Sequence, residues 1–239
     1  SDENLKLFTV FVFITLIKNI DDFNTNGTIA QKISISNFQP GEELRINLPT
    51  IFTGDIAINR QGTVAVGSSN QTNTTDVFVY NPISRIWNYT GQNVTLAGSS
   101  NNLVITKQGT SLSLKNSLLV VGAPDDNNDV GSIHLWNLSN TNAFNYITTL
   151  VGDDYNRASG FGDALSMSGN GLYCVVGGPK DGSVRRGSIW FFKRDGSSWR
   201  QMGTKHFPSG LTTLTFFGWT VSMNYDGTVA IAGTTASLF

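Results

Sequence analysis

A motif that recurs about every 55 residues constrains the fold of this chain more than any other feature. Each copy has an alternating apolar strand, a short turn and a second apolar strand that ends in glycine. The closing glycines are Gly67, Gly122, Gly177 and Gly233, at intervals of 55, 55 and 56 residues. Two such strands around a tight turn predict a β-hairpin. The chain therefore contains four copies of one hairpin.

A second pair of strands follows three of these hairpins. Its first strand covers residues 77–80, 133–136 and 189–192, and its second strand carries an aromatic residue at Trp87, Tyr146 and Trp199. Four strands in about 55 residues is the size of a propeller blade. We therefore predict an all-β fold, a β-propeller of about four four-stranded blades, in a single domain that covers residues 1–239.

Several residues in these units carry a resemblance to a known repeat. A Phe-Gly pair at 161–162 precedes Gly-Gly-Pro at 177–179, and Gly-Ala-Pro at 122–124 precedes Gly-Ser-Ile at 131–133. This pattern resembles the FG-GAP repeat, which is known from integrin alpha-subunit propellers and other extracellular proteins. The resemblance covers residues from about 50 to 239. It implies a propeller fold and an extracellular location, and it does not define a ligand.

The fourth hairpin, within residues 211–239, is not followed by a second pair of strands. Complete blades are expected at 41–102, 103–155 and 156–210. Residues 1–40 resemble the missing pair, with a candidate closing strand at Thr9, Val10, Phe11, Val12 and Phe13. We expect the last blade to be shared by the two ends of the chain, because sharing removes exposed strand edges.

Two alternatives to closure within one molecule remain open at this stage. The same strands would join neighbouring molecules head to tail if they completed the last blade of another copy, and a filament would result. Alternatively, further blades follow Phe239 in a longer protein.

Charge and hydropathy exclude several classes of partner. The chain has 16 Lys and Arg against 17 Asp and Glu, so no basic field exists to bind nucleic acid. The apolar run at residues 7–17 is shorter than the roughly 20 residues that a membrane-spanning helix needs. We predict no nucleic-acid partner and no membrane span.

Six Asn-x-Ser/Thr sequons indicate the compartment, since such sequons accept N-linked glycans in secreted proteins. We predict an extracellular, cell-surface or secreted glycoprotein, with glycans at Asn26, Asn70, Asn73, Asn88, Asn93 and Asn137.

The sequence offers little metal or catalytic chemistry. Asp125, Asn127 and Asp129 alternate as calcium ligands do, but the following glycine comes one position late and no Glu follows. The default interpretation is a polar turn with no metal, calcium binding by these three residues is the weaker alternative, and no cofactor other than N-linked glycans is expected. The two histidines, His134 and His206, have no nucleophile and acid at a suitable spacing, so we expect no enzyme.

Two functions fit these observations. The first is a structural, self-assembling surface protein, with other copies of itself or other surface proteins and glycans as partners. The alternative is a recognition module that binds a glycan or a protein on one rim of the propeller, which exposed aromatic and acidic side chains on that rim would favour.

Overall fold

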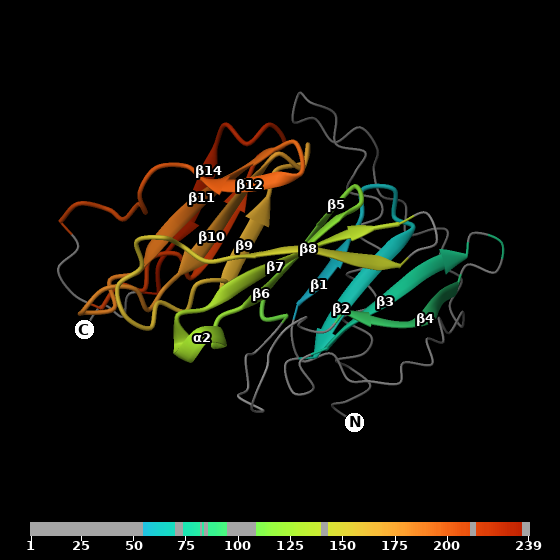
Figure 1. Ribbon diagram of the computed structural model, residues 1–239, viewed down its shortest axis with the longest axis horizontal. Helices are drawn as coiled ribbons and strands as arrows, with labels where there is room; N and C mark the ends of the chain where they lie inside the picture. Colours follow the sequence, from blue (N-terminus) through green and yellow to red (C-terminus); the bar gives the residue numbers. More distant parts are fainter. Residues whose placement is uncertain are drawn as a thin grey trace, which may run out of the picture.

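The computed structural model describes residues 55–69, 74–81, 83, 86–94, 109–139, 143–210 and 214–235. These residues form three four-stranded antiparallel sheets and one two-stranded sheet (Figure 1). The predicted closing strand at residues 9–13 and the first segment, 1–40, lie outside the described residues. No helix in the described part of the chain is long and apolar enough to cross a membrane.

Each complete sheet is a meander in which neighbours in sequence are neighbours in space. The first sheet contains β1 (Ile56–Ile58), β2 (Val64–Ser69), β3 (Thr74–Asn81) and β4 (Ile86–Val94). The second contains β5 (Leu112–Lys115), β6 (Leu118–Ala123), β7 (Ser132–Leu138) and β8 (Phe144–Leu150). The third contains β9 (Ala164–Met167), β10 (Tyr173–Gly178), β11 (Ser188–Asp195) and β12 (Ser198–Gln201). The fourth consists of β13 (Thr220–Met223) and β14 (Ala230–Gly233).

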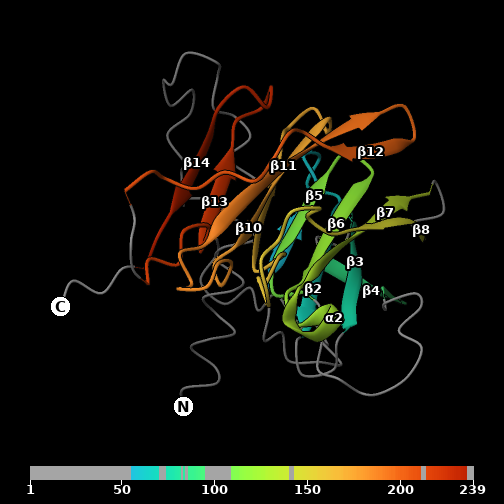
Figure 2. The same cartoon turned by 60° about the vertical axis from the view of Figure 1, so that its left-hand side comes forward.

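The four sheets pack face to face in chain order, and their first strands lie side by side (Figure 2). Strand β6 reads Leu-Leu-Val-Val-Gly-Ala and is buried at every position, because a neighbouring sheet covers each of its faces. A strand of this composition without polar alternation is the pattern expected for burial on both sides.

Aromatic side chains fill the space between the second and third sheets. Phe161 is fully buried and makes edge-to-face contacts with Trp190 and Phe192, at centroid distances of 5.3 and 5.8 Å. Burial of one such side chain contributes roughly 1.5–3 kcal/mol. The Phe-Gly pair that recurs in the sequence therefore supplies the apolar wedge between neighbouring sheets.

Glycine brings neighbouring sheets close together at equivalent points. A Cβ on Gly122 would overlap the carbonyl oxygen of Gly162, and a Cβ on Gly177 would overlap that of Gly218. Two parallel bridges, Gly131 to Phe161 and Gly187 to Phe217, join the sheets beside these contacts.

The first repeat differs by one residue from the predicted alignment. Gly122 N donates to Ser111 O at 2.9 Å, but in the first hairpin Ser68 rather than Gly67 makes the equivalent bond, to Asp55 O at 3.0 Å. The prediction that the closing glycines occupy equivalent places is wrong for Gly67. The Ser68 hydroxyl fits because it donates to the carbonyl oxygen of Gly109 in the next sheet.

Candidate functional site

Two carboxylates, the buried Asp181 and the half-buried Asp126, occupy equivalent positions in the loops between the second and third strands of two sheets. Asp126 lies four residues after Gly122, and Asp181 lies four residues after Gly177. Each accepts a hydrogen bond from the first residue of the following strand, Ser132 Oγ at 2.6 Å and Ser188 Oγ at 2.7 Å. The repeat thus builds the same carboxylate and hydroxyl pair twice along one rim.

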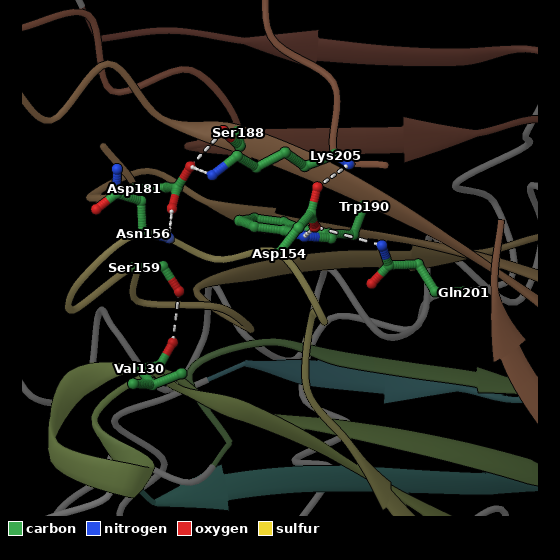
Figure 3. A network of polar contacts seen from close by, with 9 residues as sticks. All are labelled: Val130, Asp154, Asn156, Ser159, Asp181, Ser188, Trp190, Gln201 and Lys205. Carbon is green, nitrogen blue, oxygen red and sulfur yellow. Dashed lines mark hydrogen bonds and ion pairs between the residues drawn. The ribbon is translucent and has the colours of Figure 1, made fainter. Parts of the chain in front are cut away.

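In the third sheet, the carboxylate of Asp181 is 2% exposed and receives three donors (Figure 3). Lys205 Nζ lies 2.7 Å from Oδ2, beside Ser188 Oγ, and Asn156 N donates to Oδ1 at 2.6 Å. A buried charge is tolerated only when it is paired and hydrogen-bonded, and here both conditions are met.

Asp154 extends this network to the loop between the second and third sheets (Figure 3). It accepts hydrogen bonds from Trp190 Nε1 at 2.8 Å, Gln201 Nε2 at 3.3 Å and the backbone N of Lys205 at 2.8 Å. Partial burial raises the pKa of Asp154, but these bonds and the Lys205 charge outweigh it and lower the pKa below its ordinary value. The carboxylate therefore stays ionised and holds the loop against the third sheet.

In the second sheet, a chain of polar groups runs from the surface to Asp126. The Tyr146 hydroxyl contacts Thr149 Oγ1, which contacts His134 Nδ1, and His134 Nε2 contacts Ser132 Oγ, each at 2.8 Å. The nearby His134 ring, with Nε2 3.6 Å from Oδ2, is the largest influence on Asp126 and lowers the pKa of its carboxyl. Partial burial opposes this effect, and the hydrogen bond from Ser132 supports it.

The direction of these bonds argues against Ser132 as a nucleophile. Its only hydroxyl proton is donated to Asp126, so the oxygen accepts from His134 Nε2. In a catalytic triad the serine proton would instead point to the histidine. Cys174 is also no nucleophile, because full burial raises the pKa of its thiol to about 12.

Three arginines, two of them exposed, flank the Asp181 network. We call Arg157, Arg185 and Arg186 the arginine rim. The side chains of Arg157 and Arg185 are exposed. Neither guanidinium group forms an ion pair or a hydrogen bond with another described residue. The Arg186 guanidinium lies 4.1 Å from the centroid of the Phe207 ring.

The backbone beside the arginine rim is fixed by the buried carboxylate. Asn156, the residue before Arg157, donates to Asp181 through N and accepts from Gly182 N through O. These bonds join the two loops that carry Arg157 and Arg185. The exposed aromatic ring of Tyr155 belongs to the same loop. The arrangement offers guanidinium groups and an aromatic face to a small anionic ligand.

The residues of the weak calcium pattern are not brought together as a cluster of ligands. Asp125 Oδ1 lies 3.6 Å from Lys180 Nζ, whereas Asn127 and Asp129 are exposed in the short turn α2 (Asp126–Asp129). Within the described ranges, no group of three or more His, Cys, Asp or Glu side chains could hold a metal ion.

Two of the predicted glycan acceptors have described side chains, and both are exposed. Asn88 lies within β4 and Asn137 near the end of β7. The backbone of Asn93 also lies in β4. Asn26, Asn70 and Asn73 lie outside the described residues. Glycan attachment stays a prediction.

Sequence reasoning missed Asp154, Asp181 and Lys205. A local signal exists for the repeated carboxylates, because both loops read Gly-x-Pro-x-Asp and both following strands begin with Gly-Ser-Ile. Asp154 and Lys205 are brought together by the fold from positions 51 residues apart, so no spacing in the sequence predicts their contact.

Four-stranded antiparallel sheets packed face to face, with their first strands side by side, define a β-propeller. The predicted all-β propeller class is confirmed. No family model and no curated protein matches the sequence.

Among solved structures, the fold is similar to a protein from Lactobacillus plantarum, with a TM-score of 0.51, 14% identity, and coverage of 76% of this chain and 50% of that one. It is also similar to a protein from Bacteroides uniformis provisionally described as a 6-phosphogluconolactonase, with a TM-score of 0.51, 13% identity, and coverage of 74% and 46%. A Bacteroides fragilis protein with the same provisional description has a TM-score of 0.47 and 13% identity, and covers 64% and 38%. The chain spans half or less of these structures.

This finding corrects the expected function. The expected structural, self-assembling role is wrong, because a similar structure, the Bacteroides uniformis protein, is provisionally described as a 6-phosphogluconolactonase. It also conflicts with the expectation that the protein is not an enzyme. At these identities the likeness establishes the fold alone.

Proposed function

We propose that this propeller binds a small anionic sugar, either a sugar phosphate or a sugar acid, at the arginine rim. The observation that carries the proposal is the pair of exposed guanidinium groups, Arg157 and Arg185, on loops fixed by the buried Asp181. Guanidinium groups bind phosphate and carboxylate oxygens through two parallel hydrogen bonds. Such bonds to a charged group each contribute about 1.5–3 kcal/mol.

The aromatic ring of Tyr155 supports a sugar as the neutral part of the ligand. It is exposed and lies two residues before Arg157. An aromatic face packs against the apolar face of a sugar ring while its hydroxyls remain in water. The provisional description of the similar structures, 6-phosphogluconolactonase, refers to a phosphorylated sugar lactone and supports the same ligand class.

The proposal concerns binding and assigns no catalytic residue. Lactone hydrolysis requires a group that activates water, and Ser132 and Cys174 do not supply a nucleophile. An activity assay therefore decides whether the protein also hydrolyses a lactone.

Isothermal titration of the protein with 6-phosphogluconate, gluconate and glucose tests the proposal. We expect the two anions to bind and glucose to bind much more weakly. Arg157→Ala and Arg185→Ala should each weaken binding roughly tenfold or more. Arg200→Ala, at an exposed arginine on β12, is the matched control and should bind as the wild type does. Equal affinity for glucose, or unchanged binding by both rim variants, would contradict the proposal.

A lactonase assay with 6-phosphogluconolactone is the second arm. If the wild type hydrolyses the lactone faster than the spontaneous reaction and both rim variants lose this activity, the proposal extends from binding to catalysis. Binding without hydrolysis would restrict it to binding.

A further inference from the structure

The fourth hairpin exposes an apolar face that the other three repeats bury. Ile231 lies two positions before the closing residue Gly233 and is 71% exposed. The residues at the same position in the first three repeats are Val66, Val120 and Val175, and all three are 0% exposed. Val229, which precedes β14 and lies two positions before Ile231, is 56% exposed.

In the other repeats, the next hairpin along the chain covers this face. For the second and third repeats, the first strand of that hairpin donates a backbone hydrogen bond to a serine of the preceding one, from Met167 N to Ser113 Oγ at 3.3 Å and from Met223 N to Ser166 Oγ at 3.1 Å. Ser222 is the equivalent serine of the fourth hairpin, and no described residue donates to its hydroxyl.

The closing glycine of the fourth hairpin also lacks a described packing partner in a following hairpin. Gly122 and Gly177 each pack against backbone of the following hairpin, so closely that a Cβ would overlap it. Among the described residues, a Cβ on Gly233 would meet only Thr220, its partner within the same hairpin. The fourth hairpin therefore carries the apolar residues, the serine and the glycine of a sheet interface, without a described neighbour.

We propose that residues 1–54 of the same chain cover this face. The segment is long enough for the strands of one repeat, since the intervals between Ser68, Gly122, Gly177 and Gly233 are 54, 55 and 56 residues. Residues 7–17 form an uncharged apolar run that requires burial. The apolar side chains of this run match the exposed apolar side chains of Val229 and Ile231.

The position of the first hairpin supports a segment of this chain as the occupant. Arg60, in the turn between β1 and β2, donates to the hydroxyl of Tyr225, in the turn between β13 and β14, at 3.3 Å. The guanidinium also lies 5.5 Å from the centroid of that ring. The first and fourth hairpins thus meet at one end, and residues 1–54 lead directly into the first of them.

A charge at Ile231 tests whether the face is covered. In the full chain, Ile231→Asp should lower Tm by on the order of 10 °C, because an aspartate would be buried without a partner. Ile83→Asp is the matched control, since Ile83 is 93% exposed in the turn between β3 and β4, and its Tm should stay within a degree or two of the wild type. Equal Tm values for the two variants would overturn the proposal.

Photo-crosslinking identifies the occupant and does not depend on the stability of the charged variant. The full chain, with a benzophenone amino acid at position 231, is prepared in ¹⁴N and ¹⁵N forms, mixed and irradiated. We expect crosslinks to peptides from residues 1–54, with both peptides carrying the same isotope. Crosslinks between a ¹⁴N peptide and a ¹⁵N peptide would show that a second copy covers the face. The absence of crosslinks would show that the face is open to solvent. Either result would contradict the proposal.

Discussion

At the scale of single residues, the rim depends on one buried ion pair. Lys205 Nζ is the only cation within contact of Asp181 among the described residues, and both side chains are largely buried. Removing one partner of such a pair leaves an uncompensated charge in a poorly solvated place, whereas a surface pair contributes little. The Asp125 to Lys180 pair on the same rim is longer, at 3.6 Å, and its lysine is 33% exposed.

Lys205→Met should therefore lower the free energy of unfolding by about 3–5 kcal/mol. Lys180→Met, which removes the more exposed lysine, should cost about 1 kcal/mol or less. Urea denaturation of both variants measures the difference. Equal losses would show that the Lys205 pair does not hold the loops together.

The ionised state of Asp154 predicts a pH dependence. Its pKa is lowered from the ordinary value of 3.8, so the unfolded chain binds a proton more readily than the folded protein. The stabilisation is complete above the ordinary pKa and is lost as the pH falls through the folded pKa. Asp154→Asn should therefore make the fall of Tm less steep below about pH 4. Thermal melts between pH 6 and pH 2.5 test this, and parallel curves for wild type and variant would contradict it.

At the scale of elements, packing of the second and third sheets against their successors depends on glycines that leave room for the neighbouring backbone. Gly177 lies in β10, where its missing side chain makes room for the carbonyl of Gly218 in the next sheet. The alanine variant must separate two backbones that are joined by the bridge from Gly187 to Phe217 beside them.

Gly177→Ala should destabilise the protein by about 3 kcal/mol or more, since backbone cannot yield as a side chain does. Gly196→Ala is the comparison, because Gly196 has open space around it and a φ of +61°, so alanine there costs only about 1 kcal/mol of backbone strain. Chemical denaturation distinguishes the two. A Gly177→Ala variant as stable as Gly196→Ala would show that the sheets can move apart without loss.

At the scale of the whole molecule, the repeat was predictable because every sheet makes the same contacts with the next one. Those contacts select glycine and a Phe-Gly pair at fixed intervals, which a period in the sequence reveals. The alignment of the first repeat was not predictable, since Gly67 and Ser68 are both small and only tertiary contacts distinguish them, namely the bonds from Ser68 N to Asp55 O and from the Ser68 hydroxyl to Gly109 O.

The candidate site was less accessible to sequence reasoning than the fold. Asp154, Asp181 and Lys205 come from three different connections, and their contacts form only when the sheets have packed. The arginines of the rim carry no spacing that distinguishes them from solvated surface charges. The proposed binding at this rim thus depends on contacts that form in the tertiary structure, and the sequence reveals only the scaffold.

The loop between the second and third sheets is held at both ends. At one end, Ser159 Oγ donates a hydrogen bond to Val130 O, in a loop of the second sheet, at 2.7 Å. At the other end, Asp154 and Asn156 form hydrogen bonds with Trp190 and Asp181 of the third sheet. The backbone beside Arg157 is thus ordered before any ligand arrives, and the entropy of ordering it is lost during folding rather than during binding. Association at this rim should accordingly proceed without a slow conformational step, and its rate should be set by diffusion and by the charge of the ligand.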